Sequence, residues 1–391
     1  MNARAAARPA ARPGPLDLVA FAAMLVFGIV VTLLGAVMPV LSGRLSLGLG
    51  DVGTLFLAMN GAMLGASLLV GPLMDRSGTK MPLAAGTALA GVALAAVAGA
   101  NSLGFLLAAV ACLGFGGGLI NAAANTLVAD LHDDPAEKGA ALNLLGVFYG
   151  IGALLLPFAI GALLARVGLA PPLLGAATLC LVTAAIALAL RFPAAKHGHG
   201  WPLAEARRLA RLPVVLAMAF LLFFESGNEF MLGGYFATFL TQTLATPVAQ
   251  ASYILALYWA SIMAGRLIIS RGLLGRMSPH ATVLQGAIGA SVAALVVALA
   301  PSAAVACGGI IVTGLALAGI FPTVLGIAGA RFPGHSGTVF GILFTVALTG
   351  GMTLPWLAGH LAAWAGLRVV FVLVAANFVA VALLNAAARR A

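Results

Sequence analysis

The sequence predicts an all-α membrane protein with twelve transmembrane helices, arranged as two pseudo-symmetric six-helix bundles. Of the 391 residues, 62% are hydrophobic and only 8% are charged, which is about a third of the charged fraction of a soluble domain. Apolar runs of roughly 20 residues, the length of a helix that crosses the hydrocarbon core, recur along the chain. These features exclude an ordinary soluble enzyme, and the lack of alternating strand patterns argues against an outer-membrane barrel.

The apolar runs divide the chain into twelve expected spans. The first run, residues 18–41, is longer than the apolar core of a secretory signal, so we expect it to be retained as a span. The expected ranges are 17–41, 51–72, 81–100, 104–129, 139–165, 171–190, 213–241, 250–270, 279–300, 303–329, 336–363 and 367–387.

Basic residues are distributed unevenly between the two sides of this topology. With the N-terminus in the cytoplasm, the 20 lysines and arginines all fall on the cytoplasmic side, Arg266 among them, except for Arg44, Arg166 and Arg368. This distribution is what the positive-inside rule predicts. The net charge of +10 therefore indicates topology, and we expect cytoplasmic termini and no nucleic-acid partner.

Composition also limits the other functional classes. The short loops and many alanines favour a bacterial inner-membrane protein, which we expect to be a monomer in the lipid bilayer. Cys112, Cys180 and Cys307 lie in apolar segments without metal-ligand spacing, so we expect neither a metal nor a cofactor. No nucleophile or nucleotide-binding pattern is present, so the sequence does not predict an enzyme.

The chain divides into two similar halves. The longest polar interruption, residues 191–212, separates residues 1–190 from residues 213–391, and we expect it to be a cytoplasmic linker with an amphipathic segment at 203–212. A shift of 200 residues aligns Gly86 with Gly286, and a shift of 198 aligns Gly152, Pro157, Gly161 and Gly168 with Gly350, Pro355, Gly359 and Gly366. Such repetition is typical of secondary transporters.

A polar loop after the second expected span carries a recognisable motif. The loop reads "GPLMDRSGTK" (71–80) and resembles the loop signature of the major facilitator superfamily, with matches at Gly71, Asp75, Arg76, Gly78 and Lys80. Gly71 permits close helix packing, and Asp75 can approach a helix N-terminus or a basic side chain. The motif can therefore act as a latch that holds one of two conformations. The alternative is a solvated turn that only contributes to topology.

Three longer stretches resemble one branch of that superfamily. They are "GFGGGLINAAANTLVADL" (114–131), "GAALNLLGVFYGIGALLLPF" (139–158) and "LFFESGNEFMLGGYFATFL" (222–240), which are similar to the fourth, fifth and seventh spans of fucose-permease-type sugar:proton symporters. The resemblance implies a rocking motion around a sugar site at the membrane midplane. This sequence also departs from the fucose-permease type at two places. Asn121 stands where that type has a protonatable Glu, and the first span has no acid after Asp17.

Two acids lie deep in an expected span. The stretch "FFESGNEF" (223–230) places Glu225 and Glu229 four residues apart, on one helical face. An ionised side chain at this depth costs roughly 2.5 to 3.5 kcal/mol, and burial and mutual repulsion both favour the neutral acid. We expect Glu229 to bind a proton or the substrate, with Glu225 as its partner. The alternative is a structural pair of neutral acids, although membrane hydrogen bonds contribute only about 0.6 kcal/mol each.

The remaining candidates are ligands for a small-molecule substrate. Amides and aromatic rings can bind sugar hydroxyls and stack on sugar rings, and the candidates are Asn121, Asn125, Asn143, Asn228, Tyr258 and Trp259. The alternatives are interhelical hydrogen bonds for the asparagines and packing for Trp259. We therefore predict a proton-coupled uptake transporter for a sugar or similar small polar solute. The rival is a proton-driven efflux antiporter for lipophilic compounds, although we expect phenylalanines such as Phe236 and Phe239 to face lipid.

Overall fold

The structure, a computed structural model, describes residues 13–132, 134–193, 203–269 and 277–390. Almost all of these residues are helical, and twelve candidate spans among them are long and apolar enough to cross a membrane. The predicted fold class is therefore confirmed. The division of the chain at the linker stays a prediction. Outside the described residues lie linker positions 194–202 and the basic residues Arg4, Arg8, Arg12, Lys196, Arg271 and Arg276.

Two helical bundles follow one another along the chain. The first consists of α1 (Pro15–Leu45), α2 (Leu49–Ser77), α3 (Lys80–Ala98), α4 (Leu103–Leu131), α5 (Pro135–Val167) and α6 (Ala170–Ala189). A short helix, α7 (Leu203–Leu209), precedes the second bundle. That bundle consists of α8 (Pro213–Thr243), α9 (Val248–Ile268), α10 (Pro279–Leu299), α11 (Ala303–Leu317), α12 (Ile320–Arg331), α13 (Ser336–Ala365) and α14 (Arg368–Arg390).

The tenth span differs from the expected single helix. It is present, but a turn at Ala318 and Gly319 divides it into α11 and α12. Pro322 is the third residue of α12, has no backbone N–H, and in a continuous helix its ring would clash with the carbonyl of Ala318. The turn removes this clash.

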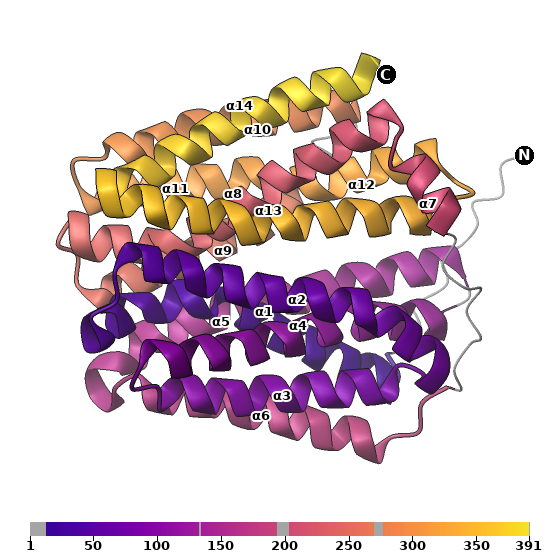
Figure 1. Cartoon of the computed structure of the whole chain (residues 1–391), viewed down its shortest axis with the longest axis horizontal. Helices are drawn as coiled ribbons and strands as arrows, with labels where there is room; N and C mark the ends of the chain where they lie inside the picture. The colour runs from indigo at the N-terminus through magenta and orange to yellow at the C-terminus, as the bar shows by residue number, and fades with distance from the viewer. Residues whose placement is uncertain (1–12, 133, 194–202, 270–276, 391) are drawn as a thin grey trace, which may run out of the picture.

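The two bundles lie side by side, and one end of the molecule carries several chain features (Figure 1). α14 finishes at Arg390 at this end, and α7 lies at the same end. Because successive spans alternate in direction, α1 begins and α2 finishes here too. We call it the terminal end.

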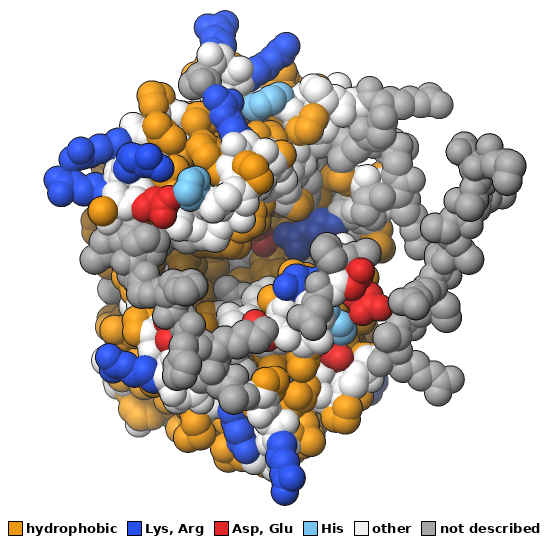
Figure 2. Space-filling view, turned by 90° about the vertical axis from the view of Figure 1, so that its right-hand side faces the viewer, with side chains coloured by type: hydrophobic (Ala, Val, Ile, Leu, Met, Phe, Trp, Pro, Cys, Tyr) orange, Lys and Arg blue, Asp and Glu red, His pale blue; other side chains and the backbone are white. Residues whose placement is uncertain are grey.

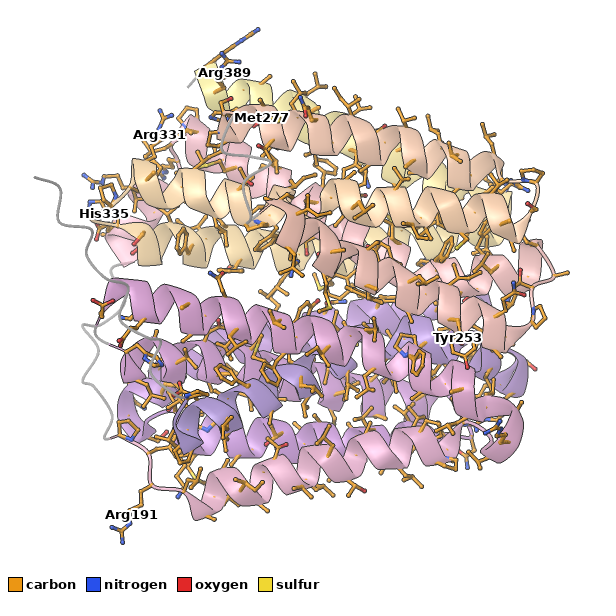
Figure 3. All side chains as sticks on the ribbon, turned by 180° about the vertical axis from the view of Figure 1, so that it is seen from behind. Arg191, Tyr253, Met277, Arg331, His335 and Arg389 are labelled. Atoms are coloured by element: carbon orange, nitrogen blue, oxygen red, sulfur yellow. The ribbon has the colours of Figure 1, made fainter. Side chains whose placement is uncertain are left out.

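The bundles contact each other mainly at the opposite end. The main helix pairs that join them are α2 with α13, α5 with α9 and α1 with α8. Phe158 of α5 packs on Tyr253 of α9 with ring centroids 5.6 Å apart, and Figure 3 shows Tyr253 far from the terminal end. Figure 2 looks at the terminal end and shows a hollow between the bundles. The molecule is therefore open at the terminal end and closed at the other.

The repeat seen in the sequence is also present in the helix contacts. In the first bundle the backbone of Leu25 passes so close to Gly152 that no side-chain carbon would fit. In the second bundle Phe223 and Gly350 make the same contact, and both members are displaced by the same 198 residues. Close approach of helix backbones is how membrane helices gain packing energy in the absence of water. The two bundles therefore contain the same close helix crossing at equivalent positions.

Valine at Gly152 or Gly350 should lower the thermal unfolding temperature, because its side chain would overlap the facing backbone. Overpacking of this kind costs about 1 to 3 kcal/mol. The controls are Gly146→Val on α5 and Gly341→Val on α13, where nothing lies within 4 Å of the added carbon. Thermal unfolding of the purified protein in detergent measures the difference. Equal losses in all four variants would contradict this account of the packing.

Candidate functional site

Glu225 and Glu229 lie near the middle of α8, the first helix of the second bundle. Glu225 is only 1% exposed, and neither of its carboxylate oxygens has a hydrogen-bond partner among the described residues. Glu229, one turn further along, is half-buried. A buried carboxyl without partners is expensive to ionise, so the two acids occupy different environments despite sharing one helical face.

The partner of Glu229 comes from the other bundle. Tyr149 of α5 makes a side-chain hydrogen bond with Glu229, in which the phenol O–H donates to the carboxylate. Tyr149 is held in place by α1, since its ring lies 5.6 Å from that of Phe27 and its backbone oxygen abuts Gly28. A hydrogen bond within the site therefore connects the two halves of the molecule.

Arg266 is the cation of the site. It lies in the last turn of α9, interacts electrostatically with both Glu225 and Glu229, and its buried Nε has no hydrogen-bond partner among the described residues. The sequence placed Arg266 with the cytoplasmic charges that set topology, and the structure adds this second role. One signal was available, because Arg266 falls inside the expected span 250–270 rather than beyond its end.

Tyr258 and Trp259 complete the site from α9. Tyr258 is fully buried and close enough to interact with Glu225, Glu229, Tyr149 and Arg266. Its ring lies 5.2 Å from that of Trp259. The Tyr258 hydroxyl and the Trp259 Nε1 have no hydrogen-bond partner among the described residues. We call Glu225, Glu229, Tyr149, Tyr258 and Arg266 the acid cluster.

The asparagines occupy three different places. Asn125 donates to the carbonyl and to the side-chain oxygen of Asn121, at 2.8 and 3.1 Å, so these two residues pair along α4. Asn143 is exposed on α5. Asn228 is buried against α14, where it accepts from Asn377 at 3.0 Å. The structure does not bring Asn228 into the acid cluster, and the substrate-binding roles of all four stay predictions.

Two phenylalanines of α8 differ from expectation. Phe236 and Phe239 are fully buried, and both pack against Phe371 of α14, with ring centroids 6.1 and 4.8 Å away. The prediction that they face lipid was wrong, because this face of α8 is covered by α14. Their rings are packed between α8 and α14 rather than exposed.

The loop motif lies at the terminal end, where α2 finishes. Gly78 has a positive φ of 72° and ends the helix after Gly71, Asp75 and Arg76, as a residue without a side chain can. Lys80 donates to the carbonyl of Leu190 at 2.9 Å and so ties α3 to the end of α6. Asp75 is half-buried, and no hydrogen bond or ion pair joins its side chain to another described residue. The latch stays a prediction.

The fold and the site agree with the sequence family. The family model of the Major Facilitator Superfamily matches residues 20–303 and 218–391, and the chain belongs to this superfamily. It is therefore a membrane transporter and not an enzyme. No curated relative matches the sequence.

Solved structures of transporters share the fold. The nucleoside transporter NupG superposes with a TM-score of 0.79 at 15% identity, covering 96% of this chain and 98% of that one. The TM-score is 0.76, at 17% identity and covering 96% of each chain, for a bacterial homologue of the human lysosomal transporter Spinster in its inward-facing and unoccupied conformation. The fucose:proton symporter FucP of E. coli gives 0.65 at 17% identity, covering 95% and 97%. These likenesses show the fold.

Removal of the Arg266 charge should destabilise the protein through the acids it leaves behind. Loss of one partner of an internal charge pair costs up to roughly 3 kcal/mol. We therefore expect Arg266→Gln to lower the thermal unfolding temperature. A double variant that also carries Glu229→Gln should recover most of this loss. Arg191→Gln, at an exposed position after α6, is the control. If the double variant were less stable than Arg266→Gln alone, the electrostatic account would be incorrect.

Proposed function

We propose that the protein is a proton-coupled transporter that takes up a sugar or similar small polar solute by alternating access, with Glu229 as the proton-binding residue. The observation that supports this most is the position of Glu229. It is half-buried in the second bundle, accepts a hydrogen bond from Tyr149 of the first bundle, and interacts with Arg266. A coupling carboxyl needs an environment that changes when the bundles move.

The motion supplies that change. If the terminal end closes and the opposite end opens, α5 and α8 shift relative to each other and the Tyr149–Glu229 hydrogen bond must be remade or broken. Protonation of Glu229 removes the electrostatic attraction between its side chain and Arg266, and deprotonation restores that attraction. The two conformations therefore differ in their affinity for a proton, which is the condition for coupling two equilibria. Glu225 is buried without a hydrogen-bond partner among the described residues, which favours the neutral state of the pair.

Several groups in this region suit a polar ring-shaped solute. The hydroxyl of Tyr258 and the Nε1 of Trp259 have no hydrogen-bond partner within the described ranges, so each can bond to a hydroxyl group of the solute, and the indole ring can stack on a sugar face. A nucleoside, the class carried by NupG, and fucose, carried by FucP, both contain such a ring. Arg266 lowers the net negative charge of the site and makes it a poorer match for a lipophilic cation.

We also propose that the terminal end faces the cytoplasm of a bacterial cell, across the inner membrane. The basic residues at this end include Arg207, Arg208, Arg331, Arg389 and Arg390, in keeping with the positive-inside rule. At the opposite end Arg44 donates to the carbonyl of Ala100, and Arg368 to that of Ala300. These two outer arginines therefore cap helix ends. In this orientation the structure is the inward-open state.

Proteoliposomes with a pH gradient test the coupling. We expect the wild type to accumulate one member of a panel of labelled monosaccharides and nucleosides. Glu229→Gln should reduce this gradient-driven accumulation by about tenfold, which is within the range of coupling between linked sites. Exchange of the same solute without a gradient should survive, because the glutamine still hydrogen-bonds. Glu225→Gln should weaken the gradient dependence.

The matched control is Glu137→Gln, an equivalent change at an exposed position on α5, which should leave accumulation unchanged. If no solute of the panel accumulates and an opposed gradient drives out a lipophilic cation instead, efflux replaces uptake as the function. If accumulation in Glu229→Gln equals that of the wild type, Glu229 is not the coupling residue.

The loop motif gives a separate prediction. A latch at Asp75 would hold the terminal end closed, so Asp75→Asn should increase the fraction of molecules open at this end. Spin labels at Ser77, the last residue of α2, and Gly337, at the start of α13, report the opening as a distance distribution. Glu137→Gln serves again as the control. An unchanged distribution in Asp75→Asn would favour the simple solvated turn.

A further inference from the structure

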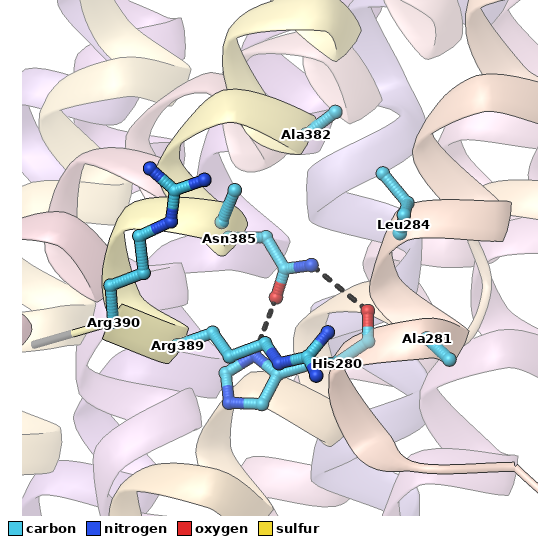
Figure 4. A pocket seen from close by; sticks show the side chains of 8 residues that line it. His280, Ala281, Leu284, Ala382, Asn385, Arg389 and Arg390 are labelled. Carbon is cyan, nitrogen blue, oxygen red and sulfur yellow. Dashed lines mark hydrogen bonds between the residues drawn. The ribbon is translucent and has the colours of Figure 1, made fainter.

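A cavity of about 470 Å³ lies between α10 and α14 in the second bundle, at the terminal end. Arg389 and Arg390, in the last turn of α14, and His280, in the first turn of α10, are among its lining residues (Figure 4). Among the described residues that line it, none is acidic. Its charged groups are therefore both cationic, and an anion is the ligand that they would attract.

The base of this cavity is fixed by a pair of hydrogen bonds. Asn385 donates to the carbonyl of His280 at 2.9 Å, and its side-chain oxygen lies 2.8 Å from the His280 Nδ1 (Figure 4). Because the amide oxygen can only accept, Nδ1 carries the hydrogen and Nε2 is the nitrogen not engaged by Asn385. Asn385 is 4% exposed. The His280 ring is therefore held in one orientation within the lining of the cavity that it shares with the two arginines.

The cavity continues as an apolar groove towards the middle of the membrane. A second cavity of about 220 Å³ shares Leu284 and Ala382 with the first and extends along the same two helices. Its lining includes Ile288, Val292 and Val379, which are about half exposed. In a membrane-spanning helix such side chains contact acyl chains. A cationic cavity at the membrane boundary thus opens directly into a groove for a hydrocarbon chain.

We propose that this composite groove binds an anionic phospholipid, with its phosphate between Arg389, Arg390 and His280 and one acyl chain along Leu284, Ile288 and Val292. Arginine forms charge-assisted hydrogen bonds with phosphate oxygens, and basic pockets at the membrane boundary attract anionic headgroups. A soluble phosphate has the same headgroup chemistry but cannot use the apolar groove. The site lies apart from the acid cluster, on α10 and α14, so it does not depend on the proposed transport function.

Native mass spectrometry tests the proposal with the full-length protein. Wild type is titrated with phosphatidylglycerol and, separately, with zwitterionic phosphatidylcholine, and we expect phosphatidylglycerol to bind preferentially. An arginine near an anionic lipid surface contributes a factor of about five in affinity, so Arg389→Gln combined with Arg390→Gln should weaken binding about twentyfold to thirtyfold. The control combines Arg191→Gln with Arg331→Gln, the same charge change at the same end of the molecule (Figure 3), and should keep wild-type affinity.

Three results would overturn the proposal. The first is equal binding of both lipids by the wild type, which needs no variant. The second is an equal loss in the control, which would reduce the effect to general surface charge. The third is that glycerol phosphate raises the thermal unfolding temperature of the wild type as much as phosphatidylglycerol does, which would indicate a site for soluble anions.

A variant of the apolar part supplies an independent check. Ala382→Phe places a ring at the junction of the two cavities and keeps both arginines. It should weaken binding of phosphatidylglycerol, whereas any weak binding of glycerol phosphate should persist. Unchanged lipid affinity in Ala382→Phe would show that the acyl chain does not occupy the groove.

Discussion

A carboxyl group in the middle of a membrane-spanning bundle depends on whichever polar groups the neighbouring helices supply. In this transporter the groups that meet Glu229 come from two helices on opposite sides of the boundary between the bundles: Tyr149 from α5 and Arg266 from α9. Neither bundle alone provides both. The environment of Glu229, the proposed proton-binding residue, is thus determined by how the halves of the protein are placed against each other.

The packing of the bundles is consistent with this dependence. Within each bundle, a glycine lets two helix backbones touch at the crossings of Gly152 with Leu25 and Gly350 with Phe223, so the helices of each half are closely packed. Between the bundles, contacts are concentrated away from the terminal end, which is hollow (Figure 2). This one-sided contact suits the proposed rocking motion, which would change the groups around the acid cluster more than those inside either bundle.

Sequence reasoning captured the parts that follow from composition and spacing. Twelve spans, the repeat and the acid pair were visible because apolar runs, glycines at equal intervals and carboxylates in an apolar helix are local features. Arg266 was assigned to topology alone, because a charge near a helix end is usually a boundary residue. Tyr149 was missed because nothing in "GVFYGIG" distinguishes a hydrogen-bonding tyrosine from a packed one.

Other differences also arise from tertiary context. Asn228 and Glu229 are adjacent in sequence, yet successive helical residues point about 100° apart, so Asn228 meets α14 while Glu229 faces α5. The same geometry buries Phe236 and Phe239 under Phe371. Which face of α8 each neighbour covers is a property of the assembled bundle, and a single sequence does not contain it.

Infrared difference spectroscopy of the protein in lipid, between acidic and alkaline buffer, tests whether Glu229 exchanges the proton. We expect a protonated carboxyl band in acid that disappears in alkali, that is absent in Glu229→Gln, and that changes frequency in Tyr149→Phe because its hydrogen bond is lost. A band that is identical in the wild type and both variants would show that Glu229 does not exchange the proton, and that the link between the bundles is only structural.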